Sequence, residues 1–450
     1  MSNRNKAFPD SSPDQNAADQ ELFQRVRQLL HNNMIRGHRK ENGSAFHYTK
    51  PSPGRYPFQF FWDTCFHVFI FSALGEHEMA KEHLYSLFAL QEEDGFVGHM
   101  IYWDRLVPGR STDVFQLKPG LGKRFFKEHM SALIQPPLVA QAVAKVFHNS
   151  GDRQFLQEML PKLKKLFDWI ALHRDFEGDG LITIISPFES GIDFKPTFDV
   201  ALGMPQRKAD WRLFVKYVGV DLRNFVYNYN LQKIYRKGYF LVKEVGFNTI
   251  YAQNLFALAD LCSEADDPDA ERYRSLGKKV VKSIIAVMYD EASAAFLDVY
   301  GKDNRKIHVV TPTVFFPAVL ENMPETITQK VIDRHLFNSQ EFDVPYPLPS
   351  VAKNHPSFNP GESMYIWRGP TWIFNNWFLH QFLIEKGHSG EATKLVESIR
   401  KLIESSGFRE YYNPFTGEGY GAKDFTWAGL VVDMIQMEKR SSSDIPSPGF

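Results

Sequence analysis

Helical periodicity recurs along almost the whole chain, and this pattern most constrains the fold. The clearest case is residues 389–405, where apolar residues spaced three and four apart share one face and Glu and Lys lie opposite. Ser389 can cap the start of this helix, and Gly407 can end it in the left-handed conformation. The same pattern predicts twelve helices, at 20–34, 62–74, 77–91, 132–149, 153–173, 248–264, 269–288, 311–321, 326–336, 371–386, 389–405 and 424–438.

Short helix–helix links alternate with long Gly/Pro-rich loops, for example 92–131 and 338–369. Twelve helices connected in this way predict an all-α fold, the (α/α)6 barrel, in which six inner helices line a funnel and the long loops build a site on one face. An irregular helical bundle is the alternative that helix counting leaves open. A Tyr-rich insertion at about 200–245 is expected to form a lid on the active-site face.

The two ends of the chain differ in composition from the helical part. Residues 1–18 are polar and rich in Pro and Ser, and residues 439–450 have a similar composition, so both are expected to be disordered tails. A single catalytic domain is expected over 19–438. The first residues contain no apolar segment of a signal peptide, and the longest apolar run is too short to span a membrane, so we expect a cytoplasmic protein.

Charge and cysteine content exclude several classes of function. The chain carries 52 Lys and Arg against 53 Asp and Glu, a balance that argues against a nucleic-acid partner. Its 2 cysteines cannot form a disulfide framework or a Cys-rich zinc site. No H-x-x-x-H pair is apparent among the 15 scattered histidines, and no phosphate-binding or dinucleotide-binding glycine pattern is present, so we expect neither a metal nor a cofactor. The aromatic content of 14% is high, and flat rings with a polar edge suit sugar faces.

Two carboxylates, Glu189 and Asp193, lie in a loop broken by Pro, Ser and Gly, with Phe188 and Phe194 nearby. A carboxyl group surrounded by aromatic rings is desolvated, and desolvation favours the protonated form that a general acid needs. A surface turn with a capping Asp is the alternative that the spacing leaves open.

A second loop places Glu410 before two tyrosines and carries Glu418 a few residues later. Either carboxylate could act as a base in a polar, aromatic-lined site. A plain helix–helix connection with an Asn-Pro turn is the alternative.

Several tryptophans adjoin polar residues, a pattern that core packing explains poorly. An apolar platform with converging hydrogen-bonding groups is how a flat, polar ligand is held. Arg368 could instead belong to a structural ion pair. The candidate binding residues of this cluster are Trp62, Asp63, Trp367, Arg368, Gly369, Trp372 and Trp427.

Taken in order, these segments resemble glycoside hydrolase family 63, which shares a clan with trehalase. The closer resemblance is to its compact members, the mannosylglycerate and glucosylglycerate hydrolases, and it covers the chain from about Phe60 to Met437. The matching blocks are Trp62-Asp63, Gln135-Pro136-Pro137, Glu189 to Asp193, Val245 to Asn248, Trp367 to Trp372, Asn376-Trp377, Glu410 to Gly417, Gly421-Ala422 and Phe425 to Trp427.

The resemblance implies an (α/α)6 barrel that inverts the anomeric centre without a metal or cofactor. It assigns the general acid to Asp193 and the general base to Glu410 rather than Glu418. It also implies that the tryptophans wall the sugar, that Asp63 and Arg368 bind its hydroxyls, and that Gln135 bounds the leaving group. Gly369 lies in the same binding block.

Two departures from the family leave the substrate open. Phe194-Lys195 stands where relatives usually have Asn-Ser, and Ile366 stands where they often have Tyr. Lys195 could bind an anionic leaving group or be a solvated loop lysine.

The sequence therefore predicts an inverting, exo-acting hydrolase of a small α-glycoside. The substrate would be an α-glucoside or a glucosyl- or mannosylglycerate, and a neutral leaving group is slightly favoured. A sugar epimerase or lyase, or a sugar-binding toroid without catalysis, are the alternatives. The oligomeric state is left open.

Overall fold

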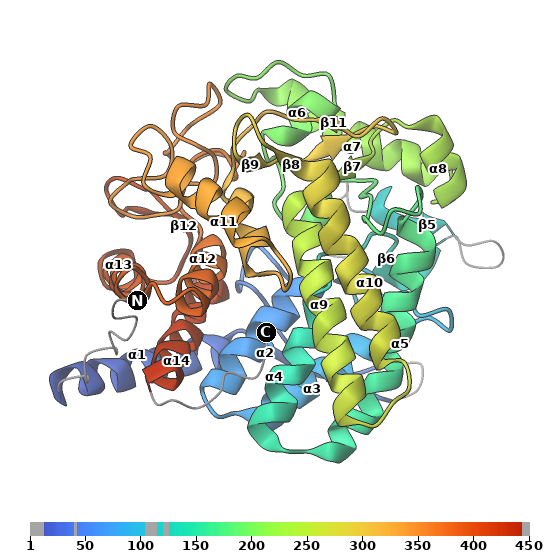
Figure 1. The fold of residues 1–450 in the computed structure, drawn as a ribbon. Helices are drawn as coiled ribbons and strands as arrows, with labels where there is room; N and C mark the ends of the chain where they lie inside the picture. Colours follow the sequence, from blue (N-terminus) through green and yellow to red (C-terminus); the bar gives the residue numbers. More distant parts are fainter. Residues whose placement is uncertain (1–12, 40–42, 104–114, 120–125, 443–450) are drawn as a thin grey trace.

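The computed structural model describes residues 13–39, 43–103, 115–119 and 126–442. Six elements form an inner ring, in which each packs against the next and the last packs against the first. This closed ring is the predicted toroid (Figure 1). Its members are α2 (Phe61–Ala73), α4 (Val139–Ser150), α9 (Val245–Glu264), the 3-10 helix η4 (Pro312–Val319), α12 (Ile373–Glu385) and α14 (Leu430–Ser442).

The inner helices lack a polar face. Every residue of α2 is buried, although the helix includes Asp63, Thr64 and His67. A helix that is surrounded by protein on all sides carries mainly apolar residues around its whole circumference, and this is the pattern of α2 and α12. The element η4 is a 3-10 helix with Pro317 inside it, since proline removes a hydrogen-bond donor and clashes with the preceding turn of an α-helix.

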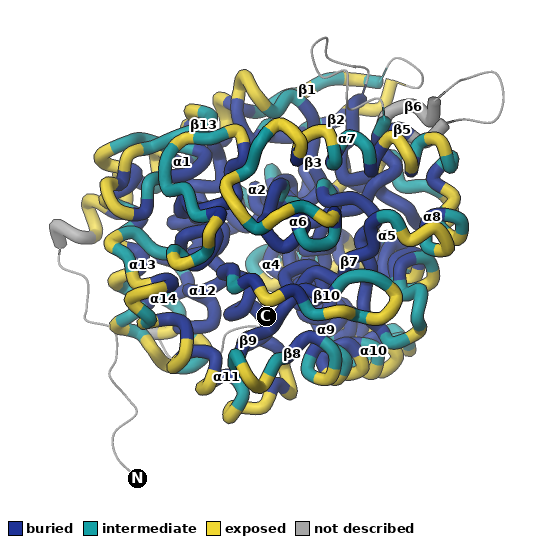
Figure 2. Tube along the Cα trace, turned by 90° about the horizontal axis from the view of Figure 1, so that it is seen from above, coloured by how far each residue is buried: buried dark blue, intermediate teal, exposed yellow. Residues whose placement is uncertain are grey.

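The outer elements are amphipathic and pack their apolar faces on the ring. In α13 the buried residues are those of the predicted stripe, from Ala392 to Ile403. Figure 2 shows buried segments in the interior and exposed ones around the rim. The outer helices are α1 (Pro13–Asn32), α3 (His77–Phe88), α5 (Arg153–Arg174), α10 (Ala270–Ser283), α11 (Glu325–Val331) and α13 (Ser389–Ser406).

All twelve predicted helical segments correspond to helical elements, with shifted ends. Helix α5 is continuous through Pro161, α10 runs into a π-turn at Ile284–Met288 (η3), and α11 runs into one at Ile332–Leu336 (η5). Helix α4 starts later than predicted, after Pro136 and Pro137, and a 3-10 turn at Thr426–Gly429 (η6) precedes α14.

Helices in the insertion were not predicted as separate elements. They are α6 (Thr197–Ala201), α7 (Trp211–Val226) and α8 (Leu231–Lys237), and a short 3-10 turn, η2 (Pro187–Ser190), precedes them. Asp210 and Asn230 cap α7 and α8 through their side chains, which is a typical start of a helix. Figure 1 shows these helices together at the top of the molecule.

The strands are short, and the largest sheet among the described residues has four strands, in the order β3-β4-β6-β5. Residues 181–185, which are rich in β-branched side chains, make only a bridge, between Ile184 and Val242. The strands are β1 (Met34–His38), β2 (Ala45–Thr49), β3 (Gln59–Phe60), β4 (Met100–Ile101), β5 (Leu117–Pro119), β6 (Phe126–Ser131), β7 (Val242–Lys243), β8 (Tyr289–Asp290), β9 (Ala295–Phe296), β10 (Val299–Tyr300), β11 (Arg305–Lys306), β12 (Arg409–Tyr412) and β13 (Gly419–Lys423).

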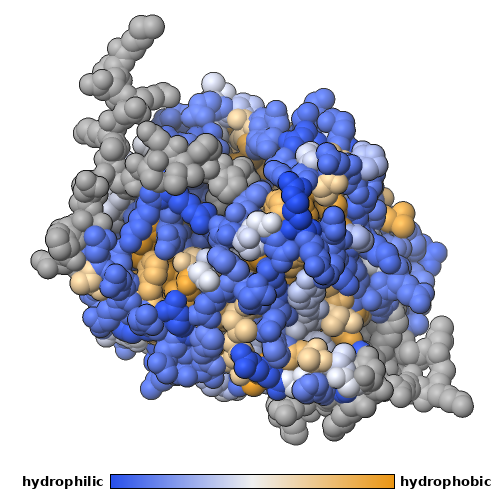
Figure 3. All heavy atoms as spheres, turned by 90° about the horizontal axis from the view of Figure 1, so that it is seen from below, coloured by the Kyte–Doolittle hydropathy of each residue, from blue (hydrophilic) through white to orange (hydrophobic). Residues whose placement is uncertain are grey.

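Helix α1 begins at Pro13, inside the range expected as the first tail, and α14 continues to Ser442, inside the range expected as the second. The remaining parts of both predicted tails, 1–12 and 443–450, lie outside the described residues. Seen from below, the surface is mostly hydrophilic, with small hydrophobic patches between polar side chains (Figure 3). No helix in the described part of the chain has the length and apolar character needed to cross a membrane.

Candidate active site

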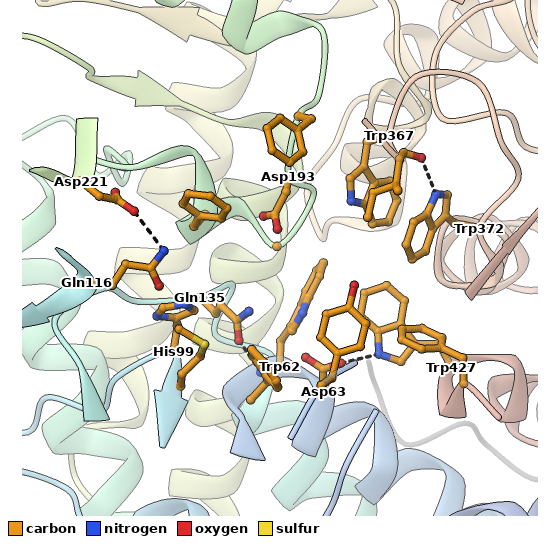
Figure 4. A pocket seen from close by; sticks show the side chains of 18 of the residues that line it. Trp62, Asp63, His99, Gln116, Gln135, Asp193, Asp221, Trp367, Trp372 and Trp427 are labelled. Carbon is orange, nitrogen blue, oxygen red and sulfur yellow. Dashed lines mark hydrogen bonds between the residues drawn. The ribbon is translucent and has the colours of Figure 1, made fainter. Parts of the chain in front are cut away.

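A cavity of about 290 Å³ lies where α2 starts and where the segments leading into α12 and α14 converge. Most of the residues predicted from sequence line it, as Figure 4 shows. These residues are Trp62, Asp63, Gln135, Asp193, Trp367, Trp372 and Trp427.

The tryptophans form one continuous aromatic wall. Trp367 and Trp372 stack with ring centroids 3.8 Å apart, and Trp62 meets Trp427 edge to face at 5.2 Å. The indole nitrogen of Trp372 donates to the carbonyl oxygen of Ile366 at 3.1 Å, which fixes its ring. The result is a rigid apolar surface of the kind that suits the face of a sugar ring.

Asp63 is a buried carboxyl group at the base of this wall. The Trp427 indole nitrogen donates to its Oδ1 at 2.7 Å. Burial raises the pKa of Asp63 to about 7, although the Trp427 hydrogen bond opposes the shift. Both protonation states of Asp63 are therefore accessible near neutral pH.

Asp193 is half-buried and projects into the cavity from the loop after η2. Gly191, with φ of 71°, lets this loop approach the wall, since a Cβ there would lie 2.2 Å from the Trp62 ring. Phe194 also adopts a positive φ, 64°, and its ring stacks on Tyr217 of α7 at 4.4 Å. The backbone on both sides of Asp193 is thus held in a conformation that side chains rarely adopt, a feature concentrated at functional sites.

Glu189, the other carboxylate of this loop, faces away from the cavity. Its oxygens accept from both terminal nitrogens of Arg174, at 2.9 and 2.5 Å, and from the backbone amides of Ile134 and Ile185. The side chain is completely buried, and it serves to anchor the loop.

Glu410 lies on β12 at the irregularity in the β12–β13 pairing, between the paired residues Arg409 and Tyr411. Its carboxylate accepts from the Tyr56 hydroxyl at 2.5 Å, from Arg55 Nη1 at 3.0 Å and from the backbone amide of Ala422 at 2.7 Å. Gly421 makes this arrangement possible, because its φ is 65° and a Cβ there would lie 2.4 Å from Glu410 Oε2. Bulges of this kind commonly re-aim side chains beside active sites.

Tyr56 connects Glu410 to the cavity. Glu410 itself is not among the lining residues, whereas Tyr56 lines the cavity and donates to it. Burial and the charge of Glu410 raise the pKa of Tyr56 well above its usual value, so the phenol stays a donor. Glu418, the other candidate in this loop, is exposed and accepts from the Tyr420 hydroxyl at 2.8 Å.

Arg368 and Gly369 do not line the cavity. The Arg368 guanidinium donates to both carboxylate oxygens of Asp199, at 2.8 and 2.5 Å. Arg368, Asp199 and Gly369 are all buried. The ion-pair alternative therefore describes Arg368, and direct contact with sugar hydroxyls does not follow from its position. The Gly369 amide donates to Ser350 Oγ at 2.9 Å, and its Cβ would lie 2.5 Å from the Asn359 carbonyl oxygen.

Lys195 is neither a solvated lysine nor a lining residue, so both expectations for it are corrected. Its ammonium group is buried, pairs with Glu244 and with Asp298 at 2.9 Å, and donates to Thr313 Oγ1 at 3.1 Å. Burial alone would lower the pKa of Lys195, but the charges of Asp298 and Glu244 raise it. The backbone turn at Phe194 sends this side chain away from the cavity.

Phe194 and Ile366, at the two positions where the sequence departs from the family, line the cavity together with Phe188. Other lining residues were not found by sequence reasoning. They come from loops, from the short strands β3 and β4 and from α7, and the signal for the α7 group was the spacing of Phe214, Val218 and Asp221 on one helical face. Among the described residues, no group of three His, Cys, Asp or Glu side chains could hold a metal ion. The lining residues that sequence reasoning did not single out are Tyr56, Phe60, His99, Met100, Gln116, Phe214, Val218, Asp221 and Phe425.

The cavity lies at the start of the inner helices of a helical toroid, has an aromatic wall and carries carboxyl groups. This combination is typical of carbohydrate-active enzymes. Residues 56–428 match the family described as "Mannosylglycerate hydrolase MGH1-like glycoside hydrolase domain", and the chain belongs to this family of glycoside hydrolases. The predicted membership of glycoside hydrolase family 63 is confirmed.

Curated relatives match over nearly the whole chain. The mannosylglycerate hydrolase of Thermus thermophilus is 29% identical over 420 residues, which cover 86% of this chain and 95% of that protein. Mannosylglycerate hydrolase MGH1 of Selaginella moellendorffii is 26% identical, with 85% and 81% covered. The glucosylglycerate hydrolase of Mycolicibacterium hassiacum is 24% identical, with 86% and 94% covered.

Solved structures agree on the fold. The GH63 mannosylglycerate hydrolase from Thermus thermophilus in complex with Tris superposes with a TM-score of 0.80 at 25% identity, covering 92% of this chain and 100% of that one. Neutral trehalase Nth1 from Saccharomyces cerevisiae superposes with a TM-score of 0.55 at 14% identity, covering 94% and 82%. The second likeness concerns the fold alone and supports the predicted (α/α)6 barrel.

Proposed function

We propose that the chain is an inverting, exo-acting hydrolase of small α-glycosides, with Asp193 as general acid and Glu410 as general base. The observation that carries this proposal is the position of Asp193. It projects between the tryptophan wall and the opposite, polar side of the cavity, where a glycosidic oxygen would join the sugar to its leaving group (Figure 4).

Asp193 would donate its proton to the glycosidic oxygen as the bond to the anomeric carbon breaks. Phe188, Phe194 and Trp367 line the same cavity, and apolar surroundings of this kind would favour the protonated carboxyl group that this step requires. The leaving group then departs as a neutral alcohol.

Glu410 would deprotonate a water molecule that attacks the anomeric carbon from the face opposite Asp193. Its carboxylate is fixed by Tyr56, Arg55 and Ala422, so it needs little reorganisation during the reaction. Inverting enzymes separate the two carboxyls by about 6.5–9.5 Å to leave room for this water. Tyr56, which contacts both the cavity and Glu410, would hold the water.

The aromatic wall would bind the sugar in the −1 subsite, and Asp63 would bind its hydroxyls. Gln135 would sit at the boundary with the leaving group, since its Oε1 accepts from the Trp62 amide at 3.1 Å and leaves its amide nitrogen toward the cavity. The relatives named for mannosylglycerate and glucosylglycerate support a hexose linked to a small alcohol as the substrate. The proposal also includes a cytoplasmic location without a membrane partner, and without a nucleic-acid partner, the last supported by the net charge of −1.

Family membership decides against the epimerase or lyase alternative, since the matching domain is a glycoside hydrolase domain. A sugar-binding toroid would keep the tryptophans but would not need Asp193 or Glu410. Turnover therefore separates catalysis from binding.

The test is hydrolysis of a panel of α-glycosides, namely glucosylglycerate, mannosylglycerate, kojibiose, nigerose and trehalose, with the released anomer followed by proton NMR. We expect at least one of these compounds to be cleaved with the glycone sugar appearing first as its β-anomer, because inversion at an α-linked anomeric carbon gives the β-sugar. Trehalose would give one α- and one β-glucose, since its leaving group is itself an α-glucose. Initial release of the glycone as the α-anomer, or of α-glucose alone from trehalose, would contradict the inverting mechanism, and binding without turnover would favour the toroid.

A further inference from the structure

The side of the cavity across Asp193 from the tryptophans is polar and carries no residue predicted from sequence except Gln135. Gln116 precedes β5, Asp221 lies on α7, and His99 precedes β4 (Figure 4). If Asp193 protonates the glycosidic oxygen between the two sides, the leaving group occupies this polar side. The inference that follows therefore rests on the proposed function.

Asp221 and Gln116 are joined in a buried hydrogen-bond chain. Ser186 Oγ donates to Asp221 Oδ1 at 2.6 Å, and Gln116 Nε2 donates to Asp221 Oδ2 at 3.0 Å. The exposed fractions of Asp221 and Gln116 are 2% and 5%. The orientation of both side chains is thus set by hydrogen bonds within the protein and not by contacts with solvent.

The hydrogen bond from Gln116 to Asp221 determines which atom of the Gln116 amide faces away from Asp221. A carboxylate only accepts hydrogen bonds, so the amide NH₂ of Gln116 must face Asp221 and its Oε1 must point the other way. Oε1 is buried, and no group in the described part of the protein donates to it. A buried acceptor without a donor costs free energy, and a ligand that supplies a donor recovers it.

The ionisable side chains that line the cavity in the described part of the chain include three carboxyl groups and neither Lys nor Arg. The three carboxyl groups belong to Asp63, Asp193 and Asp221. The two cations expected from sequence, Lys195 and Arg368, are paired with other carboxylates. A carboxylate leaving group would face these acidic side chains and an amide acceptor, an arrangement that costs affinity.

We propose that Gln116, positioned by Asp221, forms a leaving-group subsite that accepts a hydrogen bond from a hydroxyl group, so that the enzyme selects neutral, hydroxyl-bearing leaving groups and disfavours carboxylates such as glycerate. Gln116 contacts the leaving group, and Asp221 acts as a positioning residue through it. Phe214 and Val218 on the same face of α7 supply the apolar wall for its carbon skeleton.

The test compares two substrates that differ in one group, the α-glycosides of glycerol and of glycerate on the same sugar. We expect the full-length wild type to give a kcat/KM for the glycerol compound at least about tenfold higher than for the glycerate compound. Asp221→Asn removes the charge and frees the amide of Gln116 to turn, and it should reduce this preference about tenfold. Gln116→Leu should lower kcat/KM about tenfold for the glycerol compound only.

The exposed Asp303→Asn makes the same chemical change far from the cavity and should leave the ratio unchanged. The α-glycosyl fluoride of the same sugar serves as the internal reference, because its small leaving group does not reach Gln116. The rate of each variant on the fluoride is used to normalise its rates on the two glycosides, so that a general loss of activity is separated from a change in leaving-group preference. Asp303→Asn should keep its rate on the fluoride within about threefold, and circular dichroism would confirm that Asp221→Asn is folded.

Two results would overturn the subsite: a wild-type preference for the glycerate compound, or a preference that neither Asp221→Asn nor Gln116→Leu alters while the fluoride is still cleaved. Failure to cleave any α-glycoside or fluoride would instead overturn the proposed function. In that case calorimetric binding of both compounds to the full-length protein decides the subsite without turnover, and equal or tighter binding of the glycerate compound would overturn it.

Discussion

The two sides of the cavity have different structural origins. The tryptophan side is built by the ring itself, since Trp62 lies in the first turn of α2, and Trp372 and Trp427 lie just before the helical bodies of α12 and α14. The polar side is built by the short strands near Gln116 and by α7, both outside the ring. The comparison teaches that the part expected to hold the sugar belongs to the barrel framework, whereas the part expected to meet the leaving group is attached to it.

The largest expected effect concerns the group between the two sides. Asp193→Asn should lower kcat on a glycoside by about 10²–10⁴, since a positioned acid contributes that much. The loss should be much smaller on the matching glycosyl fluoride, because fluoride leaves without protonation. Steady-state kinetics on both substrates measures this, and an equal loss on both would mean that Asp193 does not act as the acid.

Glu410→Gln should lower kcat by about 10² or more on the glycoside and on the fluoride alike, since both reactions need an activated water. Glu418→Gln is the matched control from the same loop and should retain activity, because Glu418 is exposed. An inactive Glu418→Gln together with an active Glu410→Gln would reverse the assignment of the base.

Lys195→Met tests whether the Lys195 ammonium group helps the polar side of the cavity to bind an anionic leaving group. Removal of this buried ammonium leaves Glu244 and Asp298 without it, so we expect the free energy of unfolding to fall by about 3–5 kcal/mol. Denaturant unfolding measures this, with the exposed Lys278→Met as control. A stable variant that loses activity only on glycerate compounds would show that Lys195 serves the leaving group.

Asp63 on the tryptophan side gives the smallest expected effect. Its pKa of about 7 exceeds that of an unfolded Asp, so the folded protein binds the extra proton and stability falls as pH rises from about 4 to 7. Between pH 5 and pH 7 this contribution should decrease by about 2 kcal/mol. Unfolding of wild type and Asp63→Asn at both pH values measures it, and a pH-independent difference between them would contradict the raised pKa.

The ring and its tryptophans were accessible to sequence reasoning for a local reason. Helical periodicity is a property of neighbouring residues, and Trp62 and Trp367 stand directly beside polar partners. Glu410 was distinguished from Glu418 only by resemblance, since both lie in the same loop. The (α/α)6 architecture followed from the alternation of short and long connections and is confirmed.

The polar side could not be predicted because its contacts join distant parts of the chain. Gln116 and Asp221 are 105 positions apart, and neither stands in a distinctive motif. The same limit explains Arg368, whose local setting beside Trp367 suggested ligand binding while its partner, Asp199, lies 169 positions away. Periodicity and motifs reveal contacts between residues that are near in sequence. Ion pairs such as Arg368–Asp199 form only when the ring closes and brings distant segments together.

The stacking of Tyr217 on Phe194 has a consequence for protein engineering. Helix α7 contributes Asp221, Phe214 and Val218 to the cavity, and its Tyr217 also packs against Phe194, the residue next to Asp193. A chimera that exchanges α7 to accept a new substrate would therefore disturb the position of Asp193, the proposed proton donor, unless the loop holding Asp193 and Phe194 is transplanted with it. The smallest exchangeable module for redesign is the loop and the helix together.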